Sequence, residues 1–208
     1  EILTTSHTEG TGLKAFVTGG LYIDEAFTAA GLRDSQLLTP LLIVIFITLM
    51  TLLYKSYRVV IAFCLTVFTS PLVVMGVAGW TGVPFSPTIA VVPIITLTIS
   101  TATVIHLLAS LQNTQGTLPS PHAHPAKSLQ AALKHVEKPL FYTALTTSVG
   151  FLTLNLSKTP PFRIMGNLSA LGAVVAFVHA RFLFPFLYAA LNYPRLSFKP
   201  PWISALQT

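Results

Sequence analysis

The sequence predicts an all-α integral membrane protein, a polytopic helix bundle with a short extracytoplasmic α/β remnant at its amino end. Hydrophobic residues make up 52% of the 208 residues, charged residues 9%, and the mean hydropathy is +0.71. Ordinary soluble domains carry about 25% charged residues. The apolar residues cluster in runs of about 18–25, and at about 1.5 Å per residue such a helix crosses a hydrocarbon core of about 30 Å. The acidic residues fall outside these runs, at Glu1, Glu9, Asp24, Glu25, Asp34 and, in an expected loop, Glu137.

Five apolar runs are expected to span the membrane. They are residues 37–54, 59–80, 88–111, 140–157 and 162–191. The last run is long enough to tilt or to extend into the interface. Pro71, Pro93 and Pro185 fall inside these runs. Membrane helices tolerate such kinks when neighbouring groups satisfy the freed carbonyls.

Residues 1–36 are expected to be the end of an extracytoplasmic domain. The stretch LKAFVTG suggests a strand, and YIDEAFTAAGLRDSQ suggests a helix that leads into the first span. The chain begins with Glu1 and shows no basic start followed by an apolar core, as a signal sequence would. We therefore expect the carboxyl-terminal portion of a longer protein, whose missing part supplies at least one earlier span.

Residues 112–139 form the one sizeable polar loop expected between spans. Within it, residues 126–138 suit a short helix on the cytoplasmic membrane surface, with an apolar stripe toward the membrane and lysines toward anionic head groups. The stripe is Leu129, Leu133, Val136 and Leu140, and the lysines are Lys127, Lys134 and Lys138. A solvated connector helix is the alternative.

The distribution of Lys and Arg indicates the orientation. One side, which includes the tail 194–208, carries Lys55, Arg58, Lys127, Lys134, Lys138, Arg195 and Lys199; the other carries Lys14, Arg33, Lys158 and Arg163. The more basic side is expected to be cytoplasmic, so the amino end is extracytoplasmic. The bacterial inner membrane is the expected location.

Several functional classes lack support in the sequence. The basic residues lie scattered at the ends of apolar runs, which does not suggest nucleic-acid binding. The single Cys64 excludes a disulfide within the chain. His122, His124 and His135 have no matching Cys or acid cluster, so no metal site is expected. No phosphate loop, nucleophile elbow or paired carboxylates occur, and we expect neither an enzyme nor a cofactor.

Several stretches resemble a known transporter family. They are VTGGLYIDEAF, LLYKSYRVVI, MGVAGWTGVPFSPTIAVVPIITLTISTATVIHLLAS and EKPLFYTALTTSVGFLTLNLSKTPPFRIMGNLSALGA. Together they are similar to half of a resistance-nodulation-cell division (RND) transporter, in its MMPL branch, which is related to sterol-sensing domains. The resemblance covers residues 14–193 and implies helices two to six of a half-transporter that pairs with a second half. It also implies export of lipids, drugs or other hydrophobic molecules, usually driven by the proton gradient.

The resemblance also points to a missing acid. In this family the fourth helix usually carries a carboxylate one turn before an IHL-type stretch, and alignment on Ile105, His106 and Leu107 places that acid at Ala102. Transporters keep such costly intramembrane acids to bind protons or cations. Proton coupling through this half is therefore in doubt, and any coupling acid is expected in the partner half.

A polar face remains on two of the expected spans. Thr96, Ser100 and Thr103 fall within about 60° of one another on a helical wheel, with His106 at the edge. Thr143, Thr147 and Gly150 form a similar stripe, with Thr146 and Thr153 at its margin. The two faces are candidates to meet and line a polar path or proton relay. The alternative is that the hydroxyls bond to their own helix carbonyls and that His106 is a structural histidine or lies near the interface.

The last span carries two further features. Gly166, Ala170 and Ala173 give a small-residue stripe that suits close helix packing. His179 and Arg181 lie deep in this span by count, and the long side chain of Arg181 suits snorkelling to the interface.

Two functions remain open. In the first, the chain is part of an MMPL/RND-type transporter that exports or translocates hydrophobic substrates. Its expected partners are membrane lipids and either a second half or a homo-oligomeric copy. The alternative is a sterol-sensing-like membrane module that binds lipid without pumping, and the missing acid favours it. An inactive fragment is a third possibility.

Overall fold

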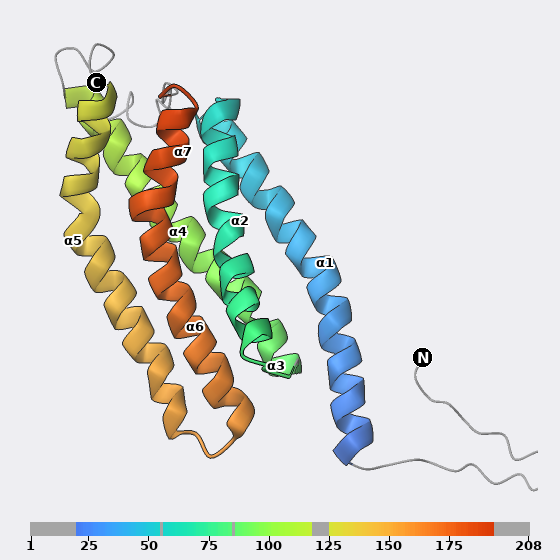
Figure 1. The fold of residues 1–208 in the computed structure, drawn as a ribbon. Helices are drawn as coiled ribbons and strands as arrows, with labels where there is room; N and C mark the ends of the chain where they lie inside the picture. Colours follow the sequence, from blue (N-terminus) through green and yellow to red (C-terminus); the bar gives the residue numbers. More distant parts are fainter. Residues whose placement is uncertain (1–19, 55, 85, 118–124, 194–208) are drawn as a thin grey trace, which may run out of the picture.

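The computed structural model describes residues 20–54, 56–84, 86–117 and 125–193, and every regular element in these ranges is helical (Figure 1). The elements are α1 (Gly20–Tyr54), α2 (Tyr57–Trp80), α3 (Pro87–Ala90), α4 (Val92–Thr117), α5 (Pro125–Leu152), the 3₁₀ turn η1 (Thr153–Leu156), α6 (Pro160–Val178), the π-helical turn η2 (His179–Leu183) and α7 (Phe184–Ala190). The expected strand at residues 13–19, His122, His124 and the tail 194–208 lie outside the described residues.

Four described helical stretches are long and apolar enough to cross a membrane. They are Glu25–Tyr54, Tyr57–Trp80, Pro87–Gln115 and Pro160–Ala190. The first, second and third expected runs fall within them, and the fifth does so except for residue 191. The fourth run, residues 140–157, does not qualify, because it shares its helix with the polar residues of 125–139 and its threonines lower the hydropathy. Five spans are therefore not confirmed.

The amino-terminal helix is long and makes few contacts. α1 starts well before the expected span, because the segment that leads into residues 37–54 continues the same helix. It contacts α2 near its carboxyl end, where Met50 and Tyr54 are buried, and α3 near Gly31. Most apolar side chains of α1 remain exposed along its length.

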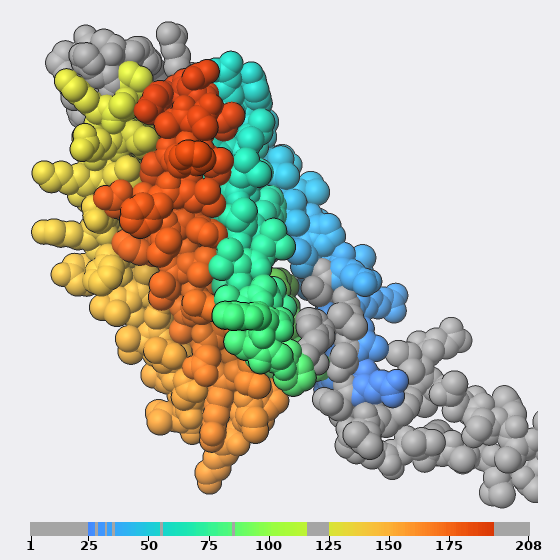
Figure 2. Space-filling model, viewed as in Figure 1, coloured from blue at the N-terminus to red at the C-terminus, as the bar shows by residue number. Residues whose placement is uncertain are grey.

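α5 is one uninterrupted helix. The expected surface helix at 126–138 and the beginning of the run at 140–157 join within it, and the helix continues through Pro139. Proline removes one backbone donor, and membrane helices accept this where other groups compensate. Glu137, expected in the polar loop between spans, lies in the middle of this helix. Side chains of α5 project outward along the edge of the bundle (Figure 2).

The last expected span consists of three pieces that form one continuous rod (Figure 1). α6 passes into the π-turn η2 at His179, and α7 follows with Pro185 in its first turn. Because Pro185 has no backbone N–H, the carbonyl of Arg181 lacks the donor it would have in an α-helix. A single π-turn, in which the hydrogen bonds reach one residue further, accommodates such a gap.

α4 lies in the middle of the bundle, in contact with α2, α5 and α6. Its carboxyl half contributes Val104 and Leu108 to the main core, together with Phe63 of α2 and with Phe184 and Tyr188 of α7. Helix α4 therefore has one buried side and one side that the described helices leave open. This division decides where the expected site residues lie.

Candidate functional site

The expected polar residues of α4 do not lie on one common surface. Thr96 and Ser100 are buried, Thr103 is half-buried, and the Thr103 hydroxyl donates to the carbonyl of Ile99 at 2.8 Å. The hydroxyls of Thr96 and Ser100 are buried and find no hydrogen-bond partner among the described residues. Most described threonines, by contrast, donate their hydroxyl hydrogen to a backbone carbonyl of their own helix.

Ala102 and His106 lie on the open side of α4. Both side chains are exposed, as is Thr98 one turn earlier. The position at which the sequence resemblance predicts an acid is therefore on the surface of this bundle and not in its core. His106 lies within the candidate span Pro87–Gln115, and a polar side chain there is costly when it faces lipid.

The threonines of α5 also face outward. Thr143 donates to the carbonyl of Pro139 at 2.9 Å, and Thr146 donates to that of Tyr142 at 2.9 Å. Both side chains are exposed, whereas Thr147 is half-buried and lines a shallow apolar hollow with Gly150, Phe151 and Leu154. α4 and α5 are in contact, but the exposed threonines of α5 and the buried hydroxyls of α4 do not share a surface.

Small residues form the buried side of α6. Gly166, Ala170 and Ala173 are all buried. A Cβ atom at Gly166 would lie 2.6 Å from the backbone oxygen of Phe151, and the carbonyl of Ala170 accepts a hydrogen bond from Ser148 at 3.1 Å. A Cβ atom at Gly172 would lie 2.5 Å from Oγ1 of Thr96. The backbone of α6 therefore approaches both α5 and α4 closely.

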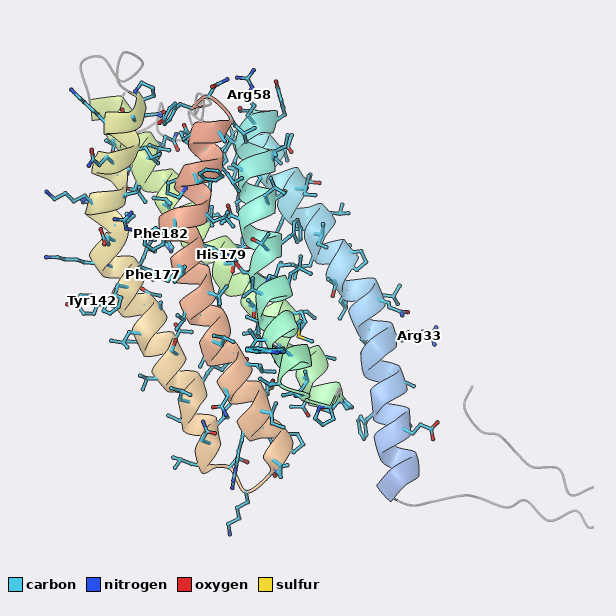
Figure 3. All side chains as sticks on the ribbon, viewed as in Figure 1. Arg33, Arg58, Tyr142, Phe177, His179 and Phe182 are labelled. Carbon is cyan, nitrogen blue, oxygen red and sulfur yellow. The ribbon has the colours of Figure 1, made fainter. Side chains whose placement is uncertain are left out.

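His179 connects the π-turn to the middle of α2. Its Nδ1 atom lies 2.8 Å from Oγ of Ser70 and 3.4 Å from Oγ1 of Thr69. The ring is half-buried, and Figure 3 shows it between the last rod and α2. Both partners lie within the candidate span Tyr57–Trp80, and His179 lies within Pro160–Ala190. This is a titratable side chain in a polar contact between two spans.

Arg181, two residues further along the π-turn, connects to α5. Its Nε atom lies 3.4 Å from Oε1 of Glu137, and the two side chains are 33% and 45% exposed. The guanidinium also lies over the ring of Phe182, 5.4 Å from its centroid. An ion pair this exposed contributes about 0–1 kcal/mol in water. Arg181 nevertheless has a carboxylate partner within the bundle. Its charge is therefore not stabilised solely by extension of the side chain to the membrane interface.

The sequence identified His179 and Arg181 but not their partners. Ser70 and His179 are 109 residues apart, and no periodicity relates them. A weak signal is present in the stretch TSPL, residues 69–72, where two hydroxyls precede a proline inside an apolar run. Glu137 was expected in the polar loop between spans, near the end of the surface helix, and no partner was assigned to it.

Within the described ranges, no three His, Cys, Asp or Glu side chains gather as metal ligands would. Cys64 is a free, half-buried cysteine. The polar side chains that do meet in these ranges include a histidine with two hydroxyls, an Arg–Glu ion pair and an Asn–Asn hydrogen bond.

Comparison with known proteins gives one match. The model of the MMPL family matches residues 2–200 of this chain. No curated protein and no solved structure shows significant similarity to it.

Proposed function

This chain belongs to the MMPL family, a family of membrane transporters of the RND type, and we propose that it forms part of a transporter for lipid-like or other hydrophobic molecules. The observation that carries this proposal is the family match over residues 2–200. The four apolar helices support it, because they are long and apolar enough to cross a membrane.

The proposed location is the bacterial inner membrane with the amino end extracytoplasmic. An impermeant amine reagent should then label Lys158, and not Lys127, from outside.

We further propose that a second half, on the same or another chain, covers the open side of α4. Thr98, Ala102 and His106 are exposed there, and hydrocarbon is a poor environment for the polar members of this set. A protein partner would supply a polar contact for His106, while the Thr98 hydroxyl already donates to the carbonyl of Ile94 at 2.8 Å. It would also supply the carboxylate that Ala102 lacks, so that proton coupling would run through the partner.

Substrate flux in sealed vesicles tests the transport proposal. The full chain, with its partner half where that half is a separate chain, would be reconstituted with a fluorescent lipid analogue, and movement of the analogue would be followed with and without a pH gradient. We expect flux above that of protein-free vesicles, and faster flux when a gradient is imposed. Flux equal to that of empty vesicles under both conditions would contradict transport.

A lipid-binding module without pumping is the second candidate function. The specific observation that favours it is the alanine at position 102, which binds no proton. Saturable binding of a photoactivatable lipid, without flux and without dependence on the pH gradient, would support this candidate. The same vesicles therefore distinguish the two functions.

A further inference from the structure

We propose that His179 is a proton-binding site inside the helix bundle, built by the hydroxyls of Ser70 and Thr69. The site itself depends only on the contact between η2 and α2. Its role in coupling rests on the proposed transport function. The proposal places a proton site within this half, in addition to any carboxylate that a partner half carries.

The two hydroxyls have more possible acceptors than hydrogens. Ser70 Oγ lies 2.8 Å from Nδ1 of His179 and 3.2 Å from the carbonyl oxygen of Thr66. Thr69 Oγ1 lies 2.8 Å from the carbonyl oxygen of Leu65, 3.0 Å from that of Thr66 and 3.4 Å from Nδ1. Each hydroxyl has one hydrogen and two lone pairs. The Thr69 hydrogen is directed to a backbone carbonyl, and the Ser70 hydrogen has two alternatives.

These alternatives match the two protonation states of the ring. When Nδ1 carries no hydrogen, the Ser70 hydroxyl donates to it. When a proton is added and both ring nitrogens carry hydrogen, Nδ1–H donates to Ser70 Oγ, and the Ser70 hydroxyl turns to the Thr66 carbonyl. Neither state leaves Nδ1 or the hydroxyl without a partner, so neither carries the cost of a buried unsatisfied polar group at this contact. Rotation of one hydroxyl is the only rearrangement required.

The position of the site gives protonation a structural consequence. His179 is the first residue of the π-turn, and π-turns inside α-helices are frequent at functional sites. The imidazole connects this turn to α2, while Arg181 connects the same turn to α5 through Glu137. A positive charge on His179 would therefore change the balance of contacts that hold the last rod between two neighbouring helices.

Few charges surround the ring. η2 contacts α2, α4, α6 and α7, and it reaches α5 through Arg181, the nearest charge in sequence, whose partner is Glu137. The other titratable groups of α5 are Lys127, Lys134, His135, Lys138 and Tyr142. Arg58 is exposed near the start of α2, and His106 faces the open side of α4. The remaining titratable groups on these elements are Tyr57, Cys64, Arg163 and Tyr188. The hydroxyls of α2 are therefore the groups that adapt to the charge on the ring.

Nuclear magnetic resonance of the histidine rings tests the site directly. The full chain, labelled with ¹⁵N-histidine, would be studied in lipid nanodiscs across about pH 5–8, the range in which imidazole ordinarily titrates. The resonances of His179 are assigned as those that are present in the spectrum of the unmodified chain and absent from that of the His179→Gln variant. We expect these resonances to move from neutral to cationic shifts as the pH falls. Neutral shifts over the whole range would overturn the proposal.

Flux then tests coupling, with a matched control. His179→Gln retains a side-chain acceptor and donor but cannot titrate in this range, and His135→Gln makes the same change at an exposed position of α5. We expect the pH gradient to stop stimulating flux in H179Q and to stimulate H135Q as it does the unmodified chain. Unchanged stimulation in H179Q would overturn the coupling role. If no protein shows flux, the transport proposal fails and the ring titration alone decides whether the proton site exists.

Discussion

At the scale of single residues, the closest helix contacts depend on the absence of side chains. A Cβ atom at Gly166 would lie 2.6 Å from the backbone oxygen of Phe151 and 2.8 Å from Cβ of Leu154. The first of these atoms belongs to the backbone and moves only with its helix. The contact between α6 and α5 therefore requires glycine at this position.

Replacement of Gly166 by alanine should destabilise the bundle. Extra atoms in a well-packed interface typically cost about 1–3 kcal/mol, so the thermal unfolding midpoint of G166A in detergent should fall. Gly150→Ala is the matched control, because a Cβ atom there meets nothing within 4 Å. In the control, higher helix propensity should leave stability equal or slightly raised, by up to about 1 kcal/mol. Equal midpoints for G166A and the unmodified chain would contradict the close contact.

At the scale of elements, α5 differs most from expectation. The apolar stripe and the lysines of its first half suggested a surface helix followed by a separate span, whereas the structure has a single helix from Pro125 to Leu152. The outcome depends on packing. Ser128, Leu129 and Ala132 are buried, and Ser110 of α4 donates to the carbonyl of Ala132 at 3.3 Å, so α4 holds the first half of α5 in line.

A distance between spin labels should distinguish the two arrangements of α5. Labels at the exposed positions Gln130 and Leu145, in a Cys64→Ser background, are 15 residues apart. A continuous helix separates their backbones by about 22 Å, and a right-angle bend at Pro139 would reduce this to about 16 Å. Pulsed electron paramagnetic resonance on the reconstituted chain should give the longer distance. A distribution centred near the shorter value would favour the surface helix.

The element scale also shows what the sequence could predict. Hydropathy alone located α2, the α3–α4 pair and the last rod to within a few residues, because long apolar runs have one stable form in a membrane. It could not locate the π-turn, since this depends on Pro185 acting within a packed bundle. The pairs Ser70–His179 and Glu137–Arg181 join residues far apart in the chain, and the hydroxyls beside Pro71 are only a weak signal that does not identify a partner.

At the scale of the whole molecule, the side of α4 that the described helices leave open carries polar side chains. Thr98, Ala102 and His106 of α4 lie on it, and Thr143 and Thr146 of α5 are exposed as well. The exposed residues of α1 are, in contrast, largely apolar, which suits contact with lipid. This difference supports the proposal that a second half covers α4.

Accessibility to oxygen should show whether that side is covered. Oxygen dissolves in the hydrocarbon core and relaxes a spin label that faces lipid. A label at Ala102 of the full chain in nanodiscs, in the Cys64→Ser background, should be protected if a partner covers α4. A label at Val174, which is exposed on α6, is the control and should be accessible. Equal accessibility would mean that α4 faces lipid. His106 would then carry its polar ring into hydrocarbon without a partner, and the proposed second half would have to bind elsewhere.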